Sequence, residues 1–372
     1  MKIGIDISVV PYGRGVANYI VALLTEFQKL APEIAFQLYC NSPTSAALPS
    51  NLKKFPLKRT RIPNRLLSFL WLDFEFPPIE WVIGNVDLFH SPAHSPVYAL
   101  CPPARKWVVT VHDLFTYKLN YNMKTQEREW KILKRIEKKA SHVIAVSNST
   151  KNDLLELIPS LEPRVSVIYE GVNSRFGKKD DYFNKLEKYG IRKPYILHVG
   201  SGGPNKNVMR LLEAFNQIKE TIDHHMVLVG DTKWRYAEAL KWASSKDLND
   251  RMIFPGFVSD EDLPAVYSEA DLFVCPSLYE GFGLVVLEAM ACECPVIASN
   301  TSSLPEVISD AGLLFDPSDT DRLAELILLV VNDSTVHEDL QRRGLKRASE
   351  FSWEFTAQKT LEVYQRVVNG CV

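Results

Sequence analysis

The stretch 271–299 constrains the fold of this chain more than any other part of its sequence. An apolar run of strand length, 271–275, ends before a proline, a loop with two glycines follows at 281–283, and good helix formers occupy 284–291. A second apolar run, 296–299, closes the stretch. This order predicts strand, loop, helix and strand. In such a unit the loop lies at the amino end of the helix, where free N–H groups and the helix dipole favour an anion.

Two carboxylates, Glu280 and Glu288, lie on either side of this loop. On one continuous helix they would be about 12 Å apart along the axis and roughly 80° out of phase. The acid/base pair of a glycoside hydrolase needs roughly 5 to 10 Å between its carboxyl groups. We therefore expect each glutamate to bind a different part of one long ligand. Taken singly, either could also be an ordinary N-cap or a solvated helix residue.

Together with the glycine loop, this Glu-x7-Glu spacing resembles the retaining, nucleotide-sugar-dependent glycosyltransferases of family 4, which have the GT-B fold. The resemblance extends over the whole chain and points to a mannosyltransferase-like subgroup. It implies that Glu280 binds hydroxyls of the donor sugar and that Glu288 binds the ribose. It also implies that the charge on the departing diphosphate is stabilised by a lysine, Lys206, and by the amides of Gly281, Phe282, Gly283 and Leu284.

Lys206 follows a glycine-containing loop and precedes a predicted helix, where a cation could meet phosphates, although a solvated lysine is the generic alternative. Gly202 lies in the same loop, but Asn205 replaces the third glycine of a dinucleotide-binding motif. Many relatives carry an arginine where this chain has Ser201. That departure puts a leaving-group site with two cations in doubt.

The turn at Phe257 and Val258 resembles the place where relatives hold the nucleobase through backbone groups. Backbone contacts do not reveal which base is bound. No Asp-x-Asp stands at a strand end. We therefore expect neither a metal nor a cofactor, the nucleoside diphosphate sugar being a co-substrate.

In the first half of the chain, Gly13, Arg14 and Gly15 follow the first predicted strand and open a helix. Such glycines could approach a phosphate, and a tight turn is an equally good explanation. In the resembled family this loop faces the cleft near the diphosphate and the acceptor.

Two predicted strands end in histidines, His90 and His112. A lone histidine at a strand end is more often structural than catalytic. His112 nevertheless lies at the carboxyl end of an apolar strand, where open α/β sheets place ligands. Its Thr-x-His-Asp context also resembles the donor-sugar-contacting histidine of the family. We therefore assign His112 a function, and retain His90, His94 and Asp113 as candidates for the cleft.

At 372 residues the chain is too long for one ordinary domain and fits two of similar size. We predict an N-terminal acceptor-side domain at 1–170, a linker at 171–193 and a nucleotide-sugar-binding domain at 194–352. By the resemblance, a terminal helix at about 353–372 crosses back to the first domain. The expected fold is α/β, of the GT-B type, with two doubly wound Rossmann-like domains facing a central cleft.

A net charge of −2 gives no reason to expect nucleic acid binding. The six cysteines are scattered, and the Cys292–Cys294 pair lacks the spacing of a zinc site, which indicates a reducing compartment. The chain enters its first strand without a signal-like leader and has no apolar run long enough to span a bilayer. We expect a cytoplasmic protein.

The segment Lys53–Trp71 differs in character from its surroundings. It carries six basic and no acidic residues up to Arg65, and then five apolar ones: Leu66, Leu67, Phe69, Leu70 and Trp71. A solvated loop beside a core helix is one explanation. A surface that meets anionic lipid headgroups on the inner face of the membrane is the other.

These observations predict transfer of a hexose, with mannose from GDP-mannose as a first guess, to a glycan or lipid-linked acceptor in the synthesis of cell-surface polysaccharide. A sugar-nucleotide epimerase or hydrolase of the same fold is one alternative. A non-catalytic partner that binds a nucleotide sugar within a glycan assembly complex is another.

Overall fold

The computed structural model describes residues 1–13, 15–42, 48–94, 106–178, 183–200, 202–230 and 236–370. The chain divides into two compact units. Unit 1 comprises residues 1–171 and 352–372, and unit 2 comprises residues 172–351. Among the helices of the described residues, none is long and apolar enough to cross a membrane.

Unit 1 is built on a parallel sheet, to which its described residues contribute seven strands. In spatial order they are β3 (Leu57–Thr60), β2 (Ala35–Asn41), β1 (Lys2–Asp6), β4 (Leu88–Ser91), β5 (Trp107–Val111), β6 (His142–Ala145) and β7 (Val165–Val167). The order reverses between β1 and β4, as it does in doubly wound sheets.

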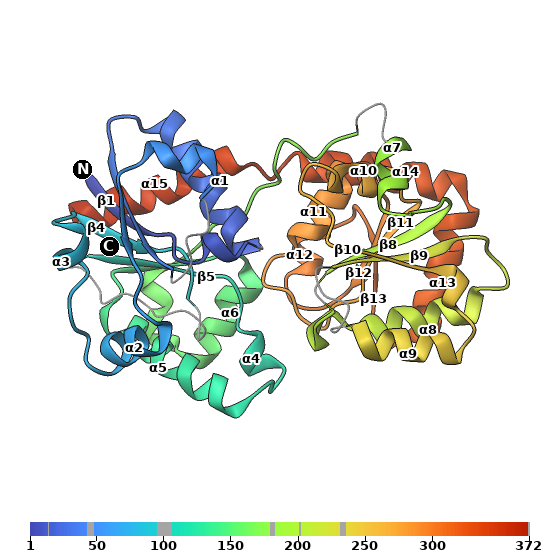
Figure 1. Ribbon diagram of the computed structural model, residues 1–372, viewed down its shortest axis with the longest axis horizontal. Helices are drawn as coiled ribbons and strands as arrows, with labels where there is room; N and C mark the ends of the chain where they lie inside the picture. The colour runs from blue at the N-terminus through green and yellow to red at the C-terminus, as the bar shows by residue number, and fades with distance from the viewer. Residues whose placement is uncertain are drawn as a thin grey trace. The chain divides into compact units, whose positions relative to one another are not determined.

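Helices cover both faces of this sheet (Figure 1). They are α1 (Gly15–Leu30), α2 (Asn64–Ser68), α3 (Glu80–Ile83), α4 (Phe115–Lys118), α5 (Met123–Lys139), α6 (Asn148–Leu157) and α15 (Trp353–Asn369). Val109 and Val111 of β5 share an apolar cluster with Ile132 of α5. Thr110 points to the opposite face, where its hydroxyl lies 3.2 Å from Tyr19 Oη of α1. This alternation is the two-residue period of a strand that is buried on both sides.

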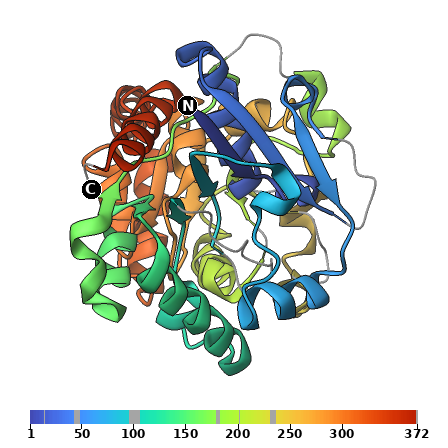
Figure 2. The same ribbon diagram turned by 90° about the vertical axis from the view of Figure 1, so that its left-hand side faces the viewer.

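The last helix packs far from its neighbours in the sequence. Both views place α15, in red, beside the blue N-terminal part of the chain (Figures 1 and 2). At one end of α15 the ammonium Nζ of Lys106 donates to the Val368 carbonyl. Near the other end, a Cβ on Gly171 would lie 2.2 Å from the Trp353 amide nitrogen, so only glycine fits there.

Unit 2 contains a second parallel sheet, with six strands among its described residues. In spatial order they are β10 (Met252–Gly256), β9 (His225–Val229), β8 (Tyr195–Val199), β11 (Leu272–Cys275), β12 (Val296–Ser299) and β13 (Leu313–Phe315). Its helices are α7 (Phe183–Lys188), α8 (Val208–Ile218), α9 (Ala237–Ser245), α10 (Leu263–Ser268), α11 (Leu284–Ala291), α12 (Leu304–Ile308), α13 (Thr320–Asn332) and α14 (Ser334–Ala348). The order reverses between β8 and β11.

The prediction of two doubly wound Rossmann-like units is therefore confirmed. Within the segment 171–193, expected to be a linker, the described residues from Val172 onward belong to unit 2. Phe176, Leu186 and Ile191 are buried in its core. Charged residues separate these apolar residues in the sequence, so no apolar run indicated that they belong to a core.

The apolar half of the segment Lys53–Trp71 is divided between core and surface. Leu67 and Trp71 are buried, so the expectation that they form part of a membrane-facing wedge is wrong. Leu66 and Phe69 are about half exposed, at 49% and 53%. The split follows the helical period, because Leu67 of α2 and Trp71 of the π-helix η3 (Phe69–Asp73) are four residues apart and so lie on the same, inward face.

Candidate functional site

The loop between β11 and α11 is held in place by its own sequence. Gly283 has a φ of +107° at the start of α11, and a Cβ there would lie 3.1 Å from Leu304 Cδ2. The positive φ favours glycine here, and a larger residue would also press on the Leu304 side chain. Phe282 is buried and its ring packs edge-on against Phe351, with centroids 5.9 Å apart. The buried ring anchors the loop, so the first amides of α11 have a defined position.

Glu280 is held by several hydrogen bonds at this loop. Its Oε1 accepts from Lys206 Nζ at 2.5 Å and from Ser277 Oγ at 2.6 Å. Its amide donates to Ser302 Oγ at 2.9 Å, and its carbonyl accepts from Ser303 Oγ at 2.9 Å. Two residues that the sequence placed in the donor site, 74 positions apart, thus form a largely buried ion pair.

Sheet topology explains why these two loops meet. Lys206 ends the turn η5 (Pro204–Lys206), which follows β8, and Glu280 follows β11, the neighbour of β8 in the sheet. The loops are also tied directly, because the Leu278 amide donates to the Asn205 carbonyl at 2.7 Å. The strand order reverses here, which is where open α/β sheets bind ligands. Gly202 lies in the same loop with a φ of +44°. Ser201 lies outside the described residues.

Glu288 lies in the second turn of α11 and has a different environment. Tyr267 Oη donates to its Oε2 at 3.2 Å. Burial raises the pKa of Glu288 to about 7, although Tyr267 and Arg175 oppose the shift. Arg175 forms an ion pair of 3.0 Å with Asp260. The carboxyl group of Glu288 therefore changes its charge near neutral pH.

The turn predicted to hold a nucleobase follows β10, where Gly256 has a φ of +77°. The Phe257 side chain is 67% exposed, whereas that of Val258 is buried. Only the backbone of Val258 is therefore available to a ligand. The ring of Phe257, in contrast, is open to solvent.

In unit 1, both ring nitrogens of His112 face acceptors. Nδ1 lies 2.9 Å from Glu170 Oε1 and Nε2 lies 2.8 Å from the Pro92 carbonyl. Burial, the largest single cause, lowers the pKa of His112, but the hydrogen bond and charge of Glu170, the Pro92 carbonyl and the charge of Asp113 together outweigh it, so the pKa is raised from its usual value. Two acceptors favour the doubly protonated ring. His112 would have to release the Pro92 carbonyl to donate from Nε2 to a sugar.

His90 is completely buried, and its expected place in a cleft is wrong. Its Nε2 lies 2.9 Å from Thr110 Oγ1 and its Nδ1 lies 2.6 Å from Tyr364 Oη. Burial lowers the pKa of His90 to about 3. His94 is also buried, 3.2 Å from Glu129 Oε1.

The remaining candidates of unit 1 lie at loop positions. Asp113 is half-buried, burial raises its pKa, and its Oδ1 accepts from the Phe115 amide at 3.3 Å. Gly13 has a φ of +69° and Gly15 is the first residue of α1, with open space where a Cβ would be at both. Arg14, between them, lies outside the described residues.

Several residues that shape the site were missed in the sequence. Ser277 lies within the stretch 271–299, and its position three residues before Glu280 could have indicated that its hydroxyl donates to that carboxylate. Ser302 and Ser303 come from the loop after β12, and no local pattern links them to Glu280. Tyr267 lies on α10 and is joined to Glu288 only by the fold.

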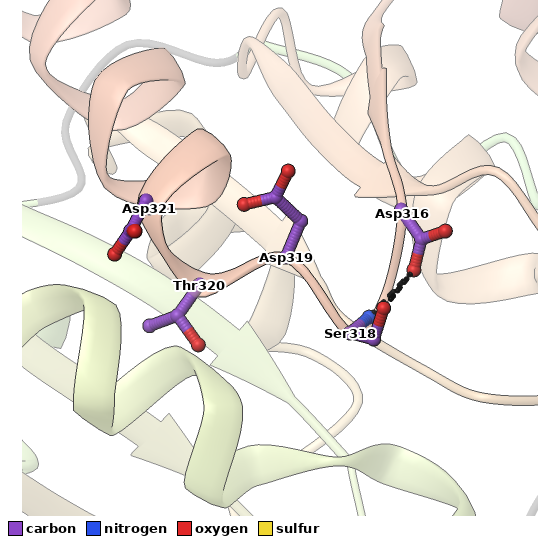
Figure 3. A pocket seen from close by; sticks show the side chains of 5 residues that line it. All are labelled: Asp316, Ser318, Asp319, Thr320 and Asp321. Atoms are coloured by element: carbon purple, nitrogen blue, oxygen red, sulfur yellow. Dashed lines mark hydrogen bonds between the residues drawn. The ribbon is translucent and has the colours of Figure 1, made fainter.

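A hollow of about 430 Å³ lies elsewhere in unit 2 (Figure 3). It is lined by Asp316, Ser318, Asp319, Thr320 and Asp321. Asp316 Oδ1 accepts from the Ser318 amide and hydroxyl at 2.8 and 2.5 Å. Asp319 caps α13 by accepting from the Arg322 amide at 2.9 Å. Three carboxylates make this hollow unsuited to a diphosphate.

Comparison with known proteins identifies a family and relatives of this chain. Residues 13–176 match the family described as "Glycosyltransferase Family 4", and residues 179–347 match "Glycosyl transferases group 1". O-antigen chain mannosyltransferase B of Escherichia coli is 32% identical over 285 residues, 73% of each chain. The serotype-specific mannosyltransferase WbdA of Escherichia coli is 31% identical over 309 residues, which are 79% of this chain and 37% of that protein.

Solved structures share the fold at lower identity. Sucrose-phosphate synthase from Thermosynechococcus elongatus superposes with a TM-score of 0.80 at 23% identity, over 100% of both chains. WaaG, a glycosyltransferase involved in lipopolysaccharide biosynthesis, has a TM-score of 0.74 at 16% identity, over 97% of this chain and 98% of that one. At these identities the likeness concerns the architecture alone.

Proposed function

The chain belongs to family 4 of the glycosyltransferases and has their GT-B fold, and from this we propose that it transfers a hexose from a nucleoside diphosphate sugar to a hydroxyl group, with retention of the anomeric configuration. The observation that carries the proposal is the pairing of Lys206 with Glu280 beside the amino end of α11, at the reversal point of the sheet. The Lys206 ammonium and the Glu280 carboxylate therefore lie at the loop that leads into the first turn of α11.

Each group has a part in the proposed reaction. Glu280 accepts hydrogen bonds from donor sugar hydroxyls, and Glu288 accepts from the ribose. The amides of 281–284 and the Lys206 ammonium stabilise the negative charge that grows on the β-phosphate as its bond to the anomeric carbon breaks. His112 contacts the sugar from unit 1. The acceptor hydroxyl forms the new bond on the same face, and its proton passes to the departing phosphate oxygen.

No metal or cofactor is required in this scheme. Support comes from the positive charge already present: the Lys206 ammonium and the amino end of α11 can neutralise a diphosphate. Activity that persists in EDTA is therefore part of the proposal.

Mannose is the proposed sugar, and GDP-mannose the proposed donor. Support comes from the two mannosyltransferases that resemble the chain at 31% and 32% identity. The name of the first also supports a growing O-antigen-like polysaccharide as acceptor. We propose that the acceptor is a glycan or a lipid-linked glycan, used on the cytoplasmic side of the membrane.

A membrane-facing surface is the second part of the proposal. Beyond Leu66 and Phe69, the side chains of Phe74, Phe76 and Trp81 are 63%, 50% and 72% exposed. Phe69 packs on Phe74, and Phe76 on Trp81, with ring centroids 4.9 and 5.2 Å apart. Exposed lysines and arginines precede them in the chain: Lys53, Lys54, Lys58, Arg61 and Arg65. Apolar side chains beside cations suit an anionic lipid surface.

The test is transfer from a panel of nucleoside diphosphate sugars to a lipid-linked or soluble glycan, followed by mass spectrometry with and without EDTA. We expect acceptor-dependent transfer from GDP-mannose that survives EDTA. Free sugar released without acceptor would indicate a hydrolase, and an isomerised donor an epimerase. Tight nucleotide binding with no turnover would indicate a non-catalytic binding protein.

A further inference from the structure

His198 lies beneath the Lys206 loop and has no role in the scheme above. It belongs to β8 and is 1% exposed. Its Nδ1 lies 3.0 Å from the Val274 carbonyl of β11. Because a carbonyl only accepts, Nδ1 must carry the ring proton. Burial lowers the pKa of His198 to about 4, so the ring is neutral and Nε2 presents a lone pair.

That lone pair is buried and makes no hydrogen bond with any of the residues that the structure describes. A buried acceptor without a partner costs free energy, so it is expected to have a donor in some state of the site. The surroundings of Gly200 identify Lys206 as a candidate donor for this lone pair. A Cβ on Gly200 would lie 3.0 Å from His198 Nε2 and 3.6 Å from Lys206 Cδ. The two side chains thus approach the same point.

In the unliganded site the Lys206 ammonium is 2.5 Å from Glu280 Oε1. Glu280 Oε1 also accepts from Ser277 Oγ, so sugar hydroxyls that donate to this oxygen, as the proposed function requires, compete with Lys206. An acceptor on β8 would then help to hold the Lys206 ammonium in position. A second carboxylate would cancel the positive charge that the leaving diphosphate needs, whereas a neutral imidazole would not.

We propose that His198 is a positioning residue for Lys206: when donor binds and Glu280 turns to the sugar, His198 Nε2 accepts from the Lys206 ammonium, directly or through one water. The inference rests on the proposed function. It assigns the buried ring a task that only a neutral acceptor can perform, since an imidazolium would repel the lysine.

Two substitutions separate the two ring nitrogens. His198→Asn retains an amide at the position of Nδ1, which can still donate to Val274, but removes Nε2. His198→Gln places an amide oxygen near the position of Nε2. We expect His198→Asn to lower kcat at least tenfold with the donor KM within about twofold, because Lys206 acts on charge that develops in the transition state. We expect His198→Gln to recover much of that loss.

A double mutant tests whether His198 acts through Lys206. Added to Lys206→Ala, His198→Asn should cost almost nothing more, because the residue that it positions is already gone. His225→Asn, the same change at a half-buried histidine at the start of β9, is the matched control and should leave kcat unchanged. Thermal unfolding of every variant checks that the fold is retained.

If His198→Asn does not fold, Gly200→Ala replaces it, because a methyl group there presses against Nε2 and the Lys206 stem. It should give the same loss of kcat. Wild-type kcat in the folded variant, or a full further loss in the Lys206→Ala background, overturns the inference and leaves the proposed function standing. A wild-type protein that transfers no sugar from any donor overturns both.

Discussion

Glu280 and Glu288 carry the same side chain eight positions apart, yet the structure gives them different chemistry. Glu280 accepts from a lysine and a serine. Glu288 accepts from a tyrosine and has a pKa raised by burial to about 7. This difference supports the division of labour between sugar and ribose, and it can be tested at each residue.

Glu280→Gln keeps the shape of the side chain but loses the charge that strengthens its hydrogen bonds to sugar hydroxyls, each worth roughly 1.5 to 3 kcal/mol. We expect transfer to fall tenfold or more while free nucleoside diphosphate still binds. Glu288→Gln should weaken nucleotide binding itself, as measured by calorimetry. Glu269→Gln, on the surface beside Lys193, is the control. Equal nucleotide affinity in all four proteins would refute the division.

The pKa of Glu288 also predicts a pH dependence. With a pKa of about 7, roughly a tenth of the carboxyl groups are ionised at pH 6 and about nine tenths at pH 8. The ionised form is the better acceptor for ribose hydroxyls, so nucleotide affinity should rise with pH, up to about tenfold over this range. The nucleotide phosphates also titrate in this range. Their contribution is found from the pH dependence of nucleotide affinity in Glu288→Gln, and it is subtracted from that of the wild type. The idea fails if the variant and the wild type have the same pH profile.

At the scale of elements, the exposed residues of α2, of η3 and of the loop that follows form the proposed membrane surface. Each lysine or arginine near an anionic bilayer contributes about 1 kcal/mol, so even three contacts should make binding detectable. We expect the protein to float with anionic vesicles at low salt, and to dissociate as salt is raised.

Two variants separate the contribution of the basic side chains to vesicle binding from that of the apolar side chains. Changing Lys58, Arg61 and Arg65 to glutamate should abolish flotation, and changing Phe69, Phe74 and Trp81 to serine should weaken it. The same charge change at Lys241, Lys246 and Lys346, which are exposed in unit 2, is the control. A wild-type protein that stays unbound with anionic vesicles at low salt would favour a soluble acceptor or a protein partner at this surface.

At the scale of the whole molecule, the predicted nucleotide contacts all lie in unit 2, between Gly202 and Glu288. Nucleoside diphosphate alone should therefore slow amide hydrogen exchange in unit 2, most strongly at 202–207 and 281–284. At 100 times its dissociation constant a ligand adds about 2.7 kcal/mol of stability, or up to about 100-fold slower exchange in the core. Protection confined to unit 1 would show that the donor site is misplaced.

How much could be predicted depended on the range of the interactions. Strands, helices and the glycine loop follow from residues that are close in sequence, so the doubly wound units and the β11–α11 loop were foreseen. Long-range contacts were not. His90 looked accessible at a strand end, but Tyr364, which contacts it, is 274 positions away. Leu66 and Leu67 are adjacent, yet only the packed core decides which of them is exposed.

The sequence by itself determined the fold class, the family and the loop that carries Glu280, because local patterns and short motifs specify them. Only the tertiary structure decided what each side chain meets: Glu280 lies beside Lys206, Ser302 and Ser303, Glu288 lies beside Tyr267, and the Nε2 lone pair of His198 meets no donor among the described residues. The physical reason is that hydrogen bonds and burial depend on distance in space. Parallel strand order brings the loops after β8, β11 and β12 to one edge of the sheet, whatever their separation along the chain.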